Sequence, residues 1–323
     1  MYRKEQYMKV LIIGAGAIGI AIGASLESQG VEVDFLARGT TLEAIRTGGV
    51  GRTGLFGEYS CPADRVGAFG TYEELPELSY DYVIISAKTM ANPEISRALW
   101  NARSCMKPSA KLVIMQNGWG NDVPYLEYFP KEQVYNARVI TGFQRTSPNI
   151  SNITVHTAPI LLGSLHGCEN QCMIPLQQAL LASGIPTEVT DEVGKFLWAK
   201  MLYNTTLNPL GAILGVNYGR LMESASSKAI MDVLIEETFT VMKAAGYSTN
   251  WESAEEYKEV FYGKLIPDTY HHRASTLQDI EKKQKTEIDT LNGCIVELAK
   301  EHHIAVPTHE MIVRLIHSIE DNF

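Results

Sequence analysis

The sequence predicts an α/β fold, with an N-terminal Rossmann-type doubly wound sheet followed by an all-helical C-terminal domain. A short apolar run, residues 8–13, leads directly into the glycine-rich hexapeptide GAGAIG. Apolar strand candidates then alternate with helical segments, whereas beyond about residue 190 only helical periodicity remains. Since 323 residues exceed one typical core, we expect two domains, a dinucleotide-binding domain over 8–187 and a helical substrate domain over 188–323.

The composition narrows the class of protein. With 45% apolar and 20% charged residues the chain has the make-up of a soluble globular protein, and its net charge of −9 disfavours nucleic acid and anionic membranes as partners. The five cysteines are odd in number and scattered, which predicts reduced thiols, no metal site and a cytoplasmic location. A homodimer is compatible with the sequence, which does not fix the oligomeric state.

The first residues imitate a signal peptide, with a basic start, MYRKEQYMK, before an apolar stretch. Glycines at 14, 16 and 19 interrupt that stretch where a strand should turn into a helix. A dinucleotide-binding start explains these glycines and an export signal does not. No other apolar run approaches the ~20 residues that a membrane span needs.

The expected N-terminal elements follow in order. Residues 8–13 form a buried strand, a helix then runs to Gly30, and residues 31–38 form the second strand of a β-α-β unit. Further apolar strands are expected at 82–86 and 111–116, each ending where a polar residue could face a ligand. This alternation predicts a parallel, doubly wound sheet.

The C-terminal part contains two clear helical patterns. Apolar residues between Ile230 and Ala245 keep a 3.6-residue period, and Gly246 should stop that helix. A long helix is expected from about Ser275 to His302 because apolar residues recur on one side of it.

The hexapeptide predicts the cofactor class. Gly14 makes the turn, Gly16 lets the backbone approach a pyrophosphate, and Gly19 allows close packing of helix on sheet. The phosphates then sit at the helix N-terminus, where free N–H groups favour an anion. The expected cofactor-binding residues of this turn are Gly14, Ala15, Gly16, Ala17, Ile18 and Gly19.

The end of the second strand distinguishes NAD from NADP. An acid there binds the ribose 2′-hydroxyl of NAD, and Asp34 lies inside the strand. Arg38 stands at the strand tip, where an arginine suits the 2′-phosphate of NADP. We therefore predict NADP, with a surface arginine and a strand-side aspartate as the alternative.

The helical stretch WAKMLYNTTLNPLGAI carries the candidate catalytic residues. Lys200, Asn204 and Asn208 are spaced by four, so they form one stripe on a helix. A lysine there can donate a proton to a ketone oxygen during hydride transfer, and the amides can hold a substrate hydroxyl or carboxylate. Pro209 should bend the helix. Spacing alone leaves an alternative equally open, in which the lysine is partly exposed and the two asparagines cap or line a domain seam.

Glu287 is the second candidate. It stands seven residues after Ile280 and four before Leu291, which places it on the apolar side of the expected long helix. A carboxylate on that side requires a partner, which Lys200 or a substrate hydroxyl could provide. The alternative is a helix-surface pair with Lys283.

Six motifs are spread along the chain: MKVLIIGAGAIG, ISAK, QNGWG, the W-x-K-x-x-x-N-x-x-x-N-P helix, STLQDIEKKQKTEIDTLNG and IAVPT. In these motifs nearly the whole chain after the first seven residues resembles the ketopantoate reductase (2-dehydropantoate 2-reductase) family. The resemblance implies a Rossmann domain, a helical domain and a cleft between them. It also implies NADPH-dependent reduction of ketopantoate, a 2-oxo acid, to (R)-pantoate.

The resemblance further implies roles for single residues. The matching lysine, Lys200, is the proton donor, and the matching glutamate, Glu287, holds the substrate hydroxyl near it. Arg38 and Lys88 match positions on the phosphate and ribose side of NADP. Positions that bind nicotinamide or substrate in the family are matched by Asn117, Asn204, Asn208 and Ser275.

One departure bears on the substrate. The family usually has asparagine three residues before the position of Ser275, and this chain has His272 there, with Thr276 in place of a methionine. Because that asparagine helps to hold the substrate carboxylate, a reductase of another 2-oxo acid is the alternative. A third hypothesis is a protein that senses NADP without turnover. Such a protein would be expected to lack Lys200 or Glu287, and this chain has both.

Overall fold

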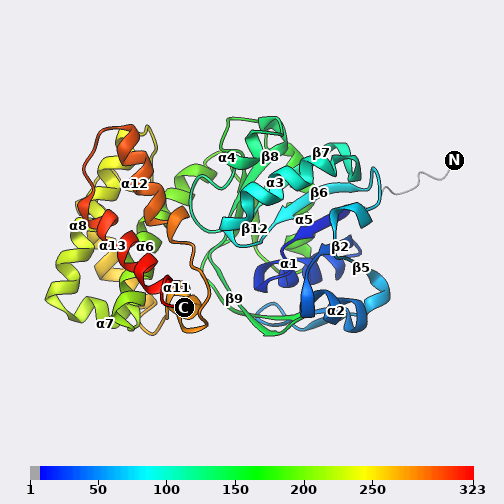
Figure 1. Cartoon of the computed structure of the whole chain (residues 1–323), viewed down its shortest axis with the longest axis horizontal. Helices are drawn as coiled ribbons and strands as arrows, with labels where there is room; N and C mark the ends of the chain where they lie inside the picture. The colour runs from blue at the N-terminus through cyan, green and yellow to red at the C-terminus, as the bar shows by residue number, and fades with distance from the viewer. Residues whose placement is uncertain (1–7) are drawn as a thin grey trace. The chain divides into compact units, whose positions relative to one another are not determined.

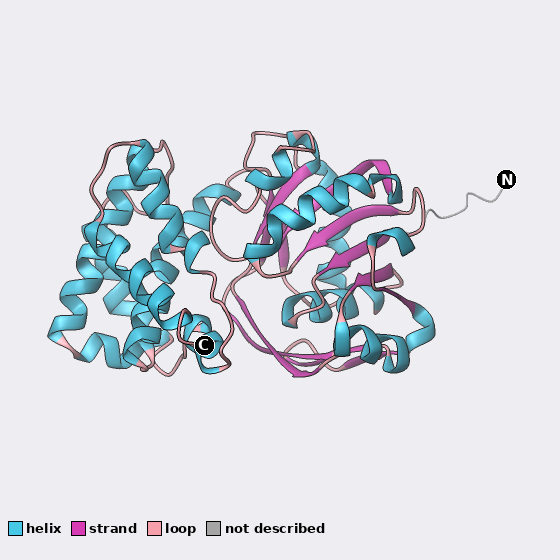
Figure 2. Ribbon diagram, viewed as in Figure 1, coloured by secondary structure: helices cyan, strands magenta, loops and turns pink. Residues whose placement is uncertain are grey.

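The computed structural model describes residues 8–323 and divides them into two compact units (Figures 1 and 2). The first unit comprises 8–116 and Asn121–Val193, and the second comprises Asn117–Gly120 and Gly194–Phe323. Both sheets lie in the first unit, and no strand follows Val189 in the described chain. The basic start, residues 1–7, lies outside the described residues.

The larger sheet of the first unit has eight strands. The predicted strands are present as β1 (Lys9–Ile13), β2 (Glu32–Leu36), β6 (Tyr80–Ile85) and β7 (Met106–Ile114). The complete order is β12 (Thr187–Val189), β11 (Ile160–Gly163), β8 (Val134–Arg138), β7, β6, β1, β2 and β5 (Val66–Phe69).

The expectation of an all-parallel sheet is wrong at one pair, because β11 runs antiparallel to β8. A parallel return between neighbouring strands requires a crossover, usually a helix. Between β8 and β11 the chain instead forms a hairpin of β9 (Thr141–Ser147) and β10 (Ile150–His156), and it therefore returns in the opposite direction.

That hairpin belongs to a second sheet that the sequence did not lead us to expect. Its order is β4 (Tyr59–Cys61), β3 (Val50–Gly54), β10 and β9. The strands β3 and β10 contact helix α1 (Ala17–Glu27), whose residues from Gly19 to Glu27 are all buried. A helix that is apolar on all sides needs such a cover on the face turned from the main sheet.

Alternate residues of β1 show how the main sheet is covered. Val10 and Ile12 belong to one hydrophobic core with α1 and α5 (Ile174–Ala182). Leu11 and Ile13 belong to another core with α3 (Asn92–Asn101) and α4 (Val123–Leu126). Successive side chains of a strand point to opposite faces, so this division places helices on both faces, as a doubly wound sheet requires. The remaining helix of this unit is α2 (Gly39–Gly48).

The second unit has one hydrophobic core, and α6 (Val193–Leu214) supplies Trp198, Met201, Leu202, Leu207 and Leu210 to it. The predicted helix before Gly246 is α8 (Ala225–Ala244), and the amide of Gly246, at φ +76°, donates to the carbonyl of Lys243. The other helices are α7 (Tyr218–Glu223), α9 (Ala254–Val260), α10 (Ile266–Asp268), α11 (Ser275–Glu281), α12 (Asn292–Glu301) and α13 (Pro307–Glu320). Within residues 8–323 no helix has the length and apolarity to cross a membrane.

The predicted long helix from Ser275 to His302 is wrong. The chain forms α11, then a short 3₁₀ turn at Ile288–Thr290, and then α12. Lys283 has φ +51°, and the amide of Gln284 donates to the carbonyl of Asp279, so the chain turns away after α11. The sequence contains the reason, since no apolar residue stands between Ile280 and Ile288 to bury two further helical turns.

Candidate functional site

The glycine-rich turn between β1 and α1 has the geometry of a dinucleotide-binding loop. Gly14 adopts φ +99°, and a Cβ atom there would lie 2.3 Å from the backbone nitrogen of Ala87. The Ser86 hydroxyl donates to the carbonyl of Gly14 at 2.8 Å. A Cβ on Gly19 would lie 2.3 Å from that same carbonyl oxygen, so only glycine fits at both positions.

Gly16 differs because a Cβ atom there would meet nothing within 4 Å. Gly16 is the N-cap of α1, it offers no side-chain hydrogen bond, and the first turn contains no acidic residue. The first backbone N–H groups of α1, which include those of Ala17 and Ile18, have no acceptor within the helix. This end of α1 therefore suits a phosphate, which brings both negative charge and acceptor oxygens.

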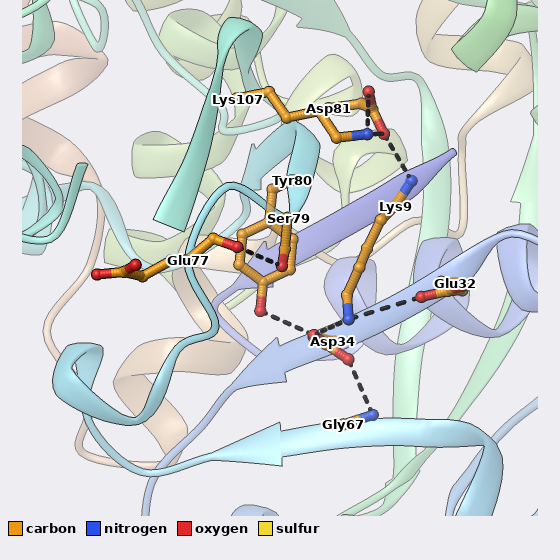
Figure 3. Close-up of polar contacts among 9 residues, drawn as sticks. All are labelled: Lys9, Glu32, Asp34, Gly67, Glu77, Ser79, Tyr80, Asp81 and Lys107. Carbon is orange, nitrogen blue, oxygen red and sulfur yellow. Dashed lines mark hydrogen bonds and ion pairs between the residues drawn. The ribbon is translucent and has the colours of Figure 1, made fainter. Parts of the chain in front are cut away.

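Asp34 is the acid that could select NAD, and its side chain contacts residues of other strands of the sheet (Figure 3). Asp34 is buried, and its carboxylate accepts hydrogen bonds from the Tyr80 hydroxyl at 2.7 Å and the Gly67 amide at 3.1 Å. Lys9 Nζ lies 3.0 Å from the same carboxylate. Burial and the nearby carboxylate raise the pKa of Tyr80 well above its ordinary value, so the phenol remains a donor to Asp34.

Arg38, by contrast, is available at the tip of β2. It is the N-cap of α2, its side chain is 78% exposed, and it pairs with Glu94 at 3.2 Å. An exposed ion pair of this kind contributes little stability, so the guanidinium can exchange Glu94 for a phosphate. Lys88 is also exposed, and it follows Ser86 and Ala87 at the end of β6.

In the second unit, α6 carries the predicted stripe. Lys200 is half-buried, while Asn204 and Asn208 are buried. The Tyr218 hydroxyl donates to Asn208 Oδ1 at 2.5 Å, which leaves the Nδ2 group of that amide as the donor. The helix continues through Pro209 to Leu214, and the bend expected at the proline stays a prediction.

The segment Asn117–Gly120 packs into the second unit. Gly118 adopts φ +97°, and a Cβ atom there would lie 2.4 Å from the carbonyl oxygen of Thr290. The Trp119 amide donates to that carbonyl at 2.9 Å. The Trp119 ring lies 5.0 Å from Trp198 and 4.8 Å from Tyr247, measured between ring centroids. These contacts fix the position of the adjacent Asn117.

Asn117 joins the two candidate catalytic residues. Lys200 Nζ donates to Asn117 Oδ1 at 2.6 Å, and Asn117 Nδ2 donates to Glu287 Oε2 at 3.3 Å. All three side chains are half-buried. An amine and a carboxylate therefore share one amide, in an arrangement that can hold a polar substrate group and supply a proton to it.

The backbone around Glu287 is anchored from both sides. Thr286 donates to Glu320 Oε1 through its amide at 2.8 Å and through its hydroxyl at 2.7 Å. The Thr290 amide donates to the Glu287 carbonyl at 3.2 Å. Because no helix runs from Lys283 to Glu287, the helix-surface pair of these residues does not have its required spacing.

The structure also places His272, the residue at the family's usual asparagine position. Its ring centroid lies 5.1 Å from that of Tyr218, the residue that orients Asn208. The Tyr218 amide donates to the His272 carbonyl at 3.2 Å. Ser275 begins α11 nearby in sequence and is exposed.

Sequence reasoning missed two residues that support this site. Tyr218 carries no pattern that links it to Asn208, ten residues earlier. Trp119 stands in the motif QNGWG, two residues after Asn117. A large aromatic residue so close to a candidate polar residue could have indicated that packing holds this segment in place. Across residues 8–323 no three His, Cys, Asp or Glu side chains gather as metal ligands.

Comparisons with known proteins agree along both units. Models of the family described as "Ketopantoate reductase PanE/ApbA" and its C-terminal part match residues 10–167 and 192–320. The 2-dehydropantoate 2-reductase of Aquifex aeolicus is 38% identical over 97% of both chains. The crystal structure of a PanE/ApbA family ketopantoate reductase from Ralstonia eutropha JMP134 superposes with a TM-score of 0.83, at 27% identity over 98% of this chain and 99% of that one. A D-mandelate dehydrogenase bound to NADH and anilino(oxo)acetate shares the fold, with a TM-score of 0.85 at 22% identity over 98% and 99%.

Two matched glycine substitutions test the dinucleotide loop. Gly14→Ala should destabilise the protein, because the left-handed backbone alone costs about 1–3 kcal/mol before the clash with Ala87 is added. Gly16→Ala should change the free energy of unfolding by no more than about 1 kcal/mol. We nevertheless expect it to weaken the binding of a nicotinamide dinucleotide, because the added methyl group would take up the open space that the sequence motif predicts for the pyrophosphate.

Urea unfolding without cofactor and fluorescence titration with NADPH measure the two effects separately. Wild-type NADPH affinity in Gly16→Ala would show that no pyrophosphate approaches this loop.

Proposed function

The chain belongs to the ketopantoate reductase family, and we propose that it reduces 2-dehydropantoate (ketopantoate) to (R)-pantoate with NADPH, a step that feeds pantothenate and coenzyme A. The observation that carries the proposal is the Lys200–Asn117–Glu287 arrangement, with contacts of 2.6 and 3.3 Å. A protein that only sensed NADP would not need these residues, so turnover is the better hypothesis.

The first unit offers residues that fit NADPH. The open space at Gly16 and the uncapped start of α1 suit the pyrophosphate, and Arg38 suits the 2′-phosphate. Asp34 is already satisfied by Tyr80, Gly67 and Lys9, so it is not free to bind a ribose 2′-hydroxyl. When bound, NADPH supplies the hydride that reaches the carbonyl carbon of the substrate.

Lys200 supplies the proton. As the carbonyl carbon is reduced, negative charge develops on its oxygen, and the Nζ group of Lys200 donates a proton there to complete the hydroxyl. Asn117 accepts a hydrogen bond from Nζ at 2.6 Å and so directs the amine.

Neutral side chains and the Glu287 carboxylate then contact different groups of the substrate. Asn204, Asn208 and Ser275 provide neutral donors for the carboxylate and the hydroxyl of the substrate. Glu287 accepts a hydrogen bond from the 4-hydroxyl of ketopantoate, and its charge disfavours a second carboxylate near the reacting carbon. This arrangement favours a 2-oxo monoacid over a dicarboxylate.

A second candidate is a reductase of another 2-oxo acid. His272 packs against Tyr218, which orients Asn208, so the departure from the family pattern falls beside a proposed substrate donor. An imidazole is larger than the usual amide, and it could change which 2-oxo acid the site accepts. The chemistry assigned to Lys200 is the same for both candidates.

Lys200→Ala tests the proton donor. Loss of a general acid should lower kcat on the order of 10²–10⁴-fold while NADPH binding remains. Lys300→Ala, the same change at an exposed lysine of the second unit, should leave kcat unchanged and is the matched control. A Lys200→Ala enzyme that retained more than half of the wild-type kcat would remove this residue from the chemistry.

Arg38→Ala tests the cofactor. Losing a charge-assisted phosphate contact should raise KM for NADPH about ten- to a hundredfold, whereas KM for NADH should change little. Arg46→Ala, at the other end of α2, is the matched control, because Arg46 pairs with Glu74 and has no assigned cofactor role. Equal effects of Arg38→Ala on both cofactors would show that Arg38 does not read the 2′-phosphate.

Side-by-side assays with ketopantoate, 2-oxoisovalerate and phenylglyoxylate test the substrate. We expect kcat/KM for ketopantoate to exceed that for 2-oxoisovalerate about ten- to a hundredfold, since 2-oxoisovalerate leaves the Glu287 carboxylate without its hydroxyl partner. His272→Asn, which restores the family's usual residue, should widen this preference.

If phenylglyoxylate or 2-oxoisovalerate is the best of the three substrates, the pantoate assignment fails and the second candidate replaces it.

A further inference from the structure

Pro209 leaves one backbone carbonyl of α6 without its helical partner. In an α-helix the carbonyl of residue 205 accepts from the amide of residue 209, and proline has no N–H to donate. Thr205 is fully buried, so water does not reach this carbonyl from the surface. An unpaired buried carbonyl is costly, and a donor from elsewhere in the chain is therefore required.

Asn292 provides that donor. Its Nδ2 lies 2.9 Å from the Thr205 carbonyl oxygen, and the asparagine is itself fully buried. Asn292 is the first residue of α12 and stands five residues after Glu287. The Thr205 carbonyl lies on the helix that carries Lys200, five residues after it.

His309 fixes the orientation of this amide. Its Nε2 lies 3.1 Å from the carbonyl of Leu234, which can only accept, so Nε2 carries the proton. Burial lowers the pKa of His309 to about 4, so the ring is neutral at pH 7 and its Nδ1 accepts a hydrogen bond. Asn292 Nδ2 lies 3.0 Å from that Nδ1. Both N–H bonds of the amide are thus used, and a flipped amide would place its oxygen against two acceptors.

The segment between Glu287 and Asn292 is short and tightly connected. The carbonyl of Thr290 accepts from the Trp119 amide, and the amide of Thr290 donates to the Glu287 carbonyl. A shift of Asn292 relative to α6 would therefore move Glu287, and with it the loop that holds Asn117, relative to Lys200. Asn292 stands in the motif STLQDIEKKQKTEIDTLNG but is not among the candidate site residues named above.

We propose that Asn292 is a positioning residue. It binds the Thr205 carbonyl, which Pro209 leaves without a helical donor, and so holds Glu287 and Asn117 at their positions relative to Lys200. This inference rests on the proposed function for its effect on catalysis. Its structural part, the coupling of Asn292 to Pro209, does not depend on any substrate.

A double-mutant cycle between Asn292→Ala and Pro209→Ala tests the proposal. Asn292→Ala alone should lower kcat on the order of ten- to a hundredfold through misplacement of the reacting groups, while KM for NADPH stays within about twofold. Pro209→Ala restores a backbone N–H that can pair with the Thr205 carbonyl. In that background Asn292→Ala should lower kcat no more than about threefold, because the carbonyl is no longer left unpaired.

Thermal unfolding without substrate supplies the second measurement. The loss of stability from Asn292→Ala should be clearly smaller in the Pro209→Ala background than in the wild type. Pro267→Ala, the same change at the start of α10, is the control background, and there the full loss should persist. If Asn292→Ala does not accumulate as folded protein, Asn292→Ser, which keeps one donor, takes its place in the cycle.

Equal losses in the wild-type and Pro209→Ala backgrounds would overturn the link through the Thr205 carbonyl. A coupled loss of stability with kcat unchanged would overturn the positioning role and leave Asn292 as a purely structural residue. Failure of the proposed function gives a different result. Wild type would then prefer another 2-oxo acid to ketopantoate, or turn over none of the three, while the coupling in stability persists.

Discussion

The site of the second unit depends on one amide held between an amine and a carboxylate. An amide has a donor side and an acceptor side, so Asn117 can serve Lys200 and Glu287 together in only one orientation. That orientation requires the chain to leave the first unit for a short segment, Asn117–Gly120, and to pack in the second. A left-handed glycine against Thr290 and the Trp119 indole, packed against both Trp198 and Tyr247, hold the segment there.

The two units offer different chemistry to the ligands proposed for them. The first unit offers backbone: a left-handed turn at Gly14, open space at Gly16 and the free N–H groups of α1. Phosphate oxygens suit such donors, and few side chains need to be specified. The second unit offers side chains from three separate segments, around Lys200, Asn117 and Glu287, and each has its own anchors. Substitutions far from the reacting atoms should therefore disturb the second unit more easily than the first.

Much of the fold could be predicted because periodicity is a local property of the sequence. The strands β1, β2, β6 and β7, the glycine loop and α8 all follow from apolar spacing and from glycines. The second sheet was missed because β3, β9 and β10 are rich in polar residues, so their pairing depends on the tertiary contact with α1. The long helix was predicted wrongly because two apolar stripes were joined across the polar residues 281–287. The absence of apolar residues in that stretch marks the end of α11.

The candidate site was predictable in its residue types and not in its contacts. A spacing of four residues placed Lys200, Asn204 and Asn208 on one helix, which α6 confirms. That Asn117 lies between Lys200 and Glu287 required the course of a loop, and that Tyr218 orients Asn208 required the packing of α7. A proline within α6 destabilises that helix by about 3 kcal/mol relative to alanine if nothing compensates. Here Asn292, oriented by the neutral His309, donates to the Thr205 carbonyl in place of the missing amide of residue 209. The hydrogen bond that compensates for the proline therefore also connects α6 to the segment that carries Glu287.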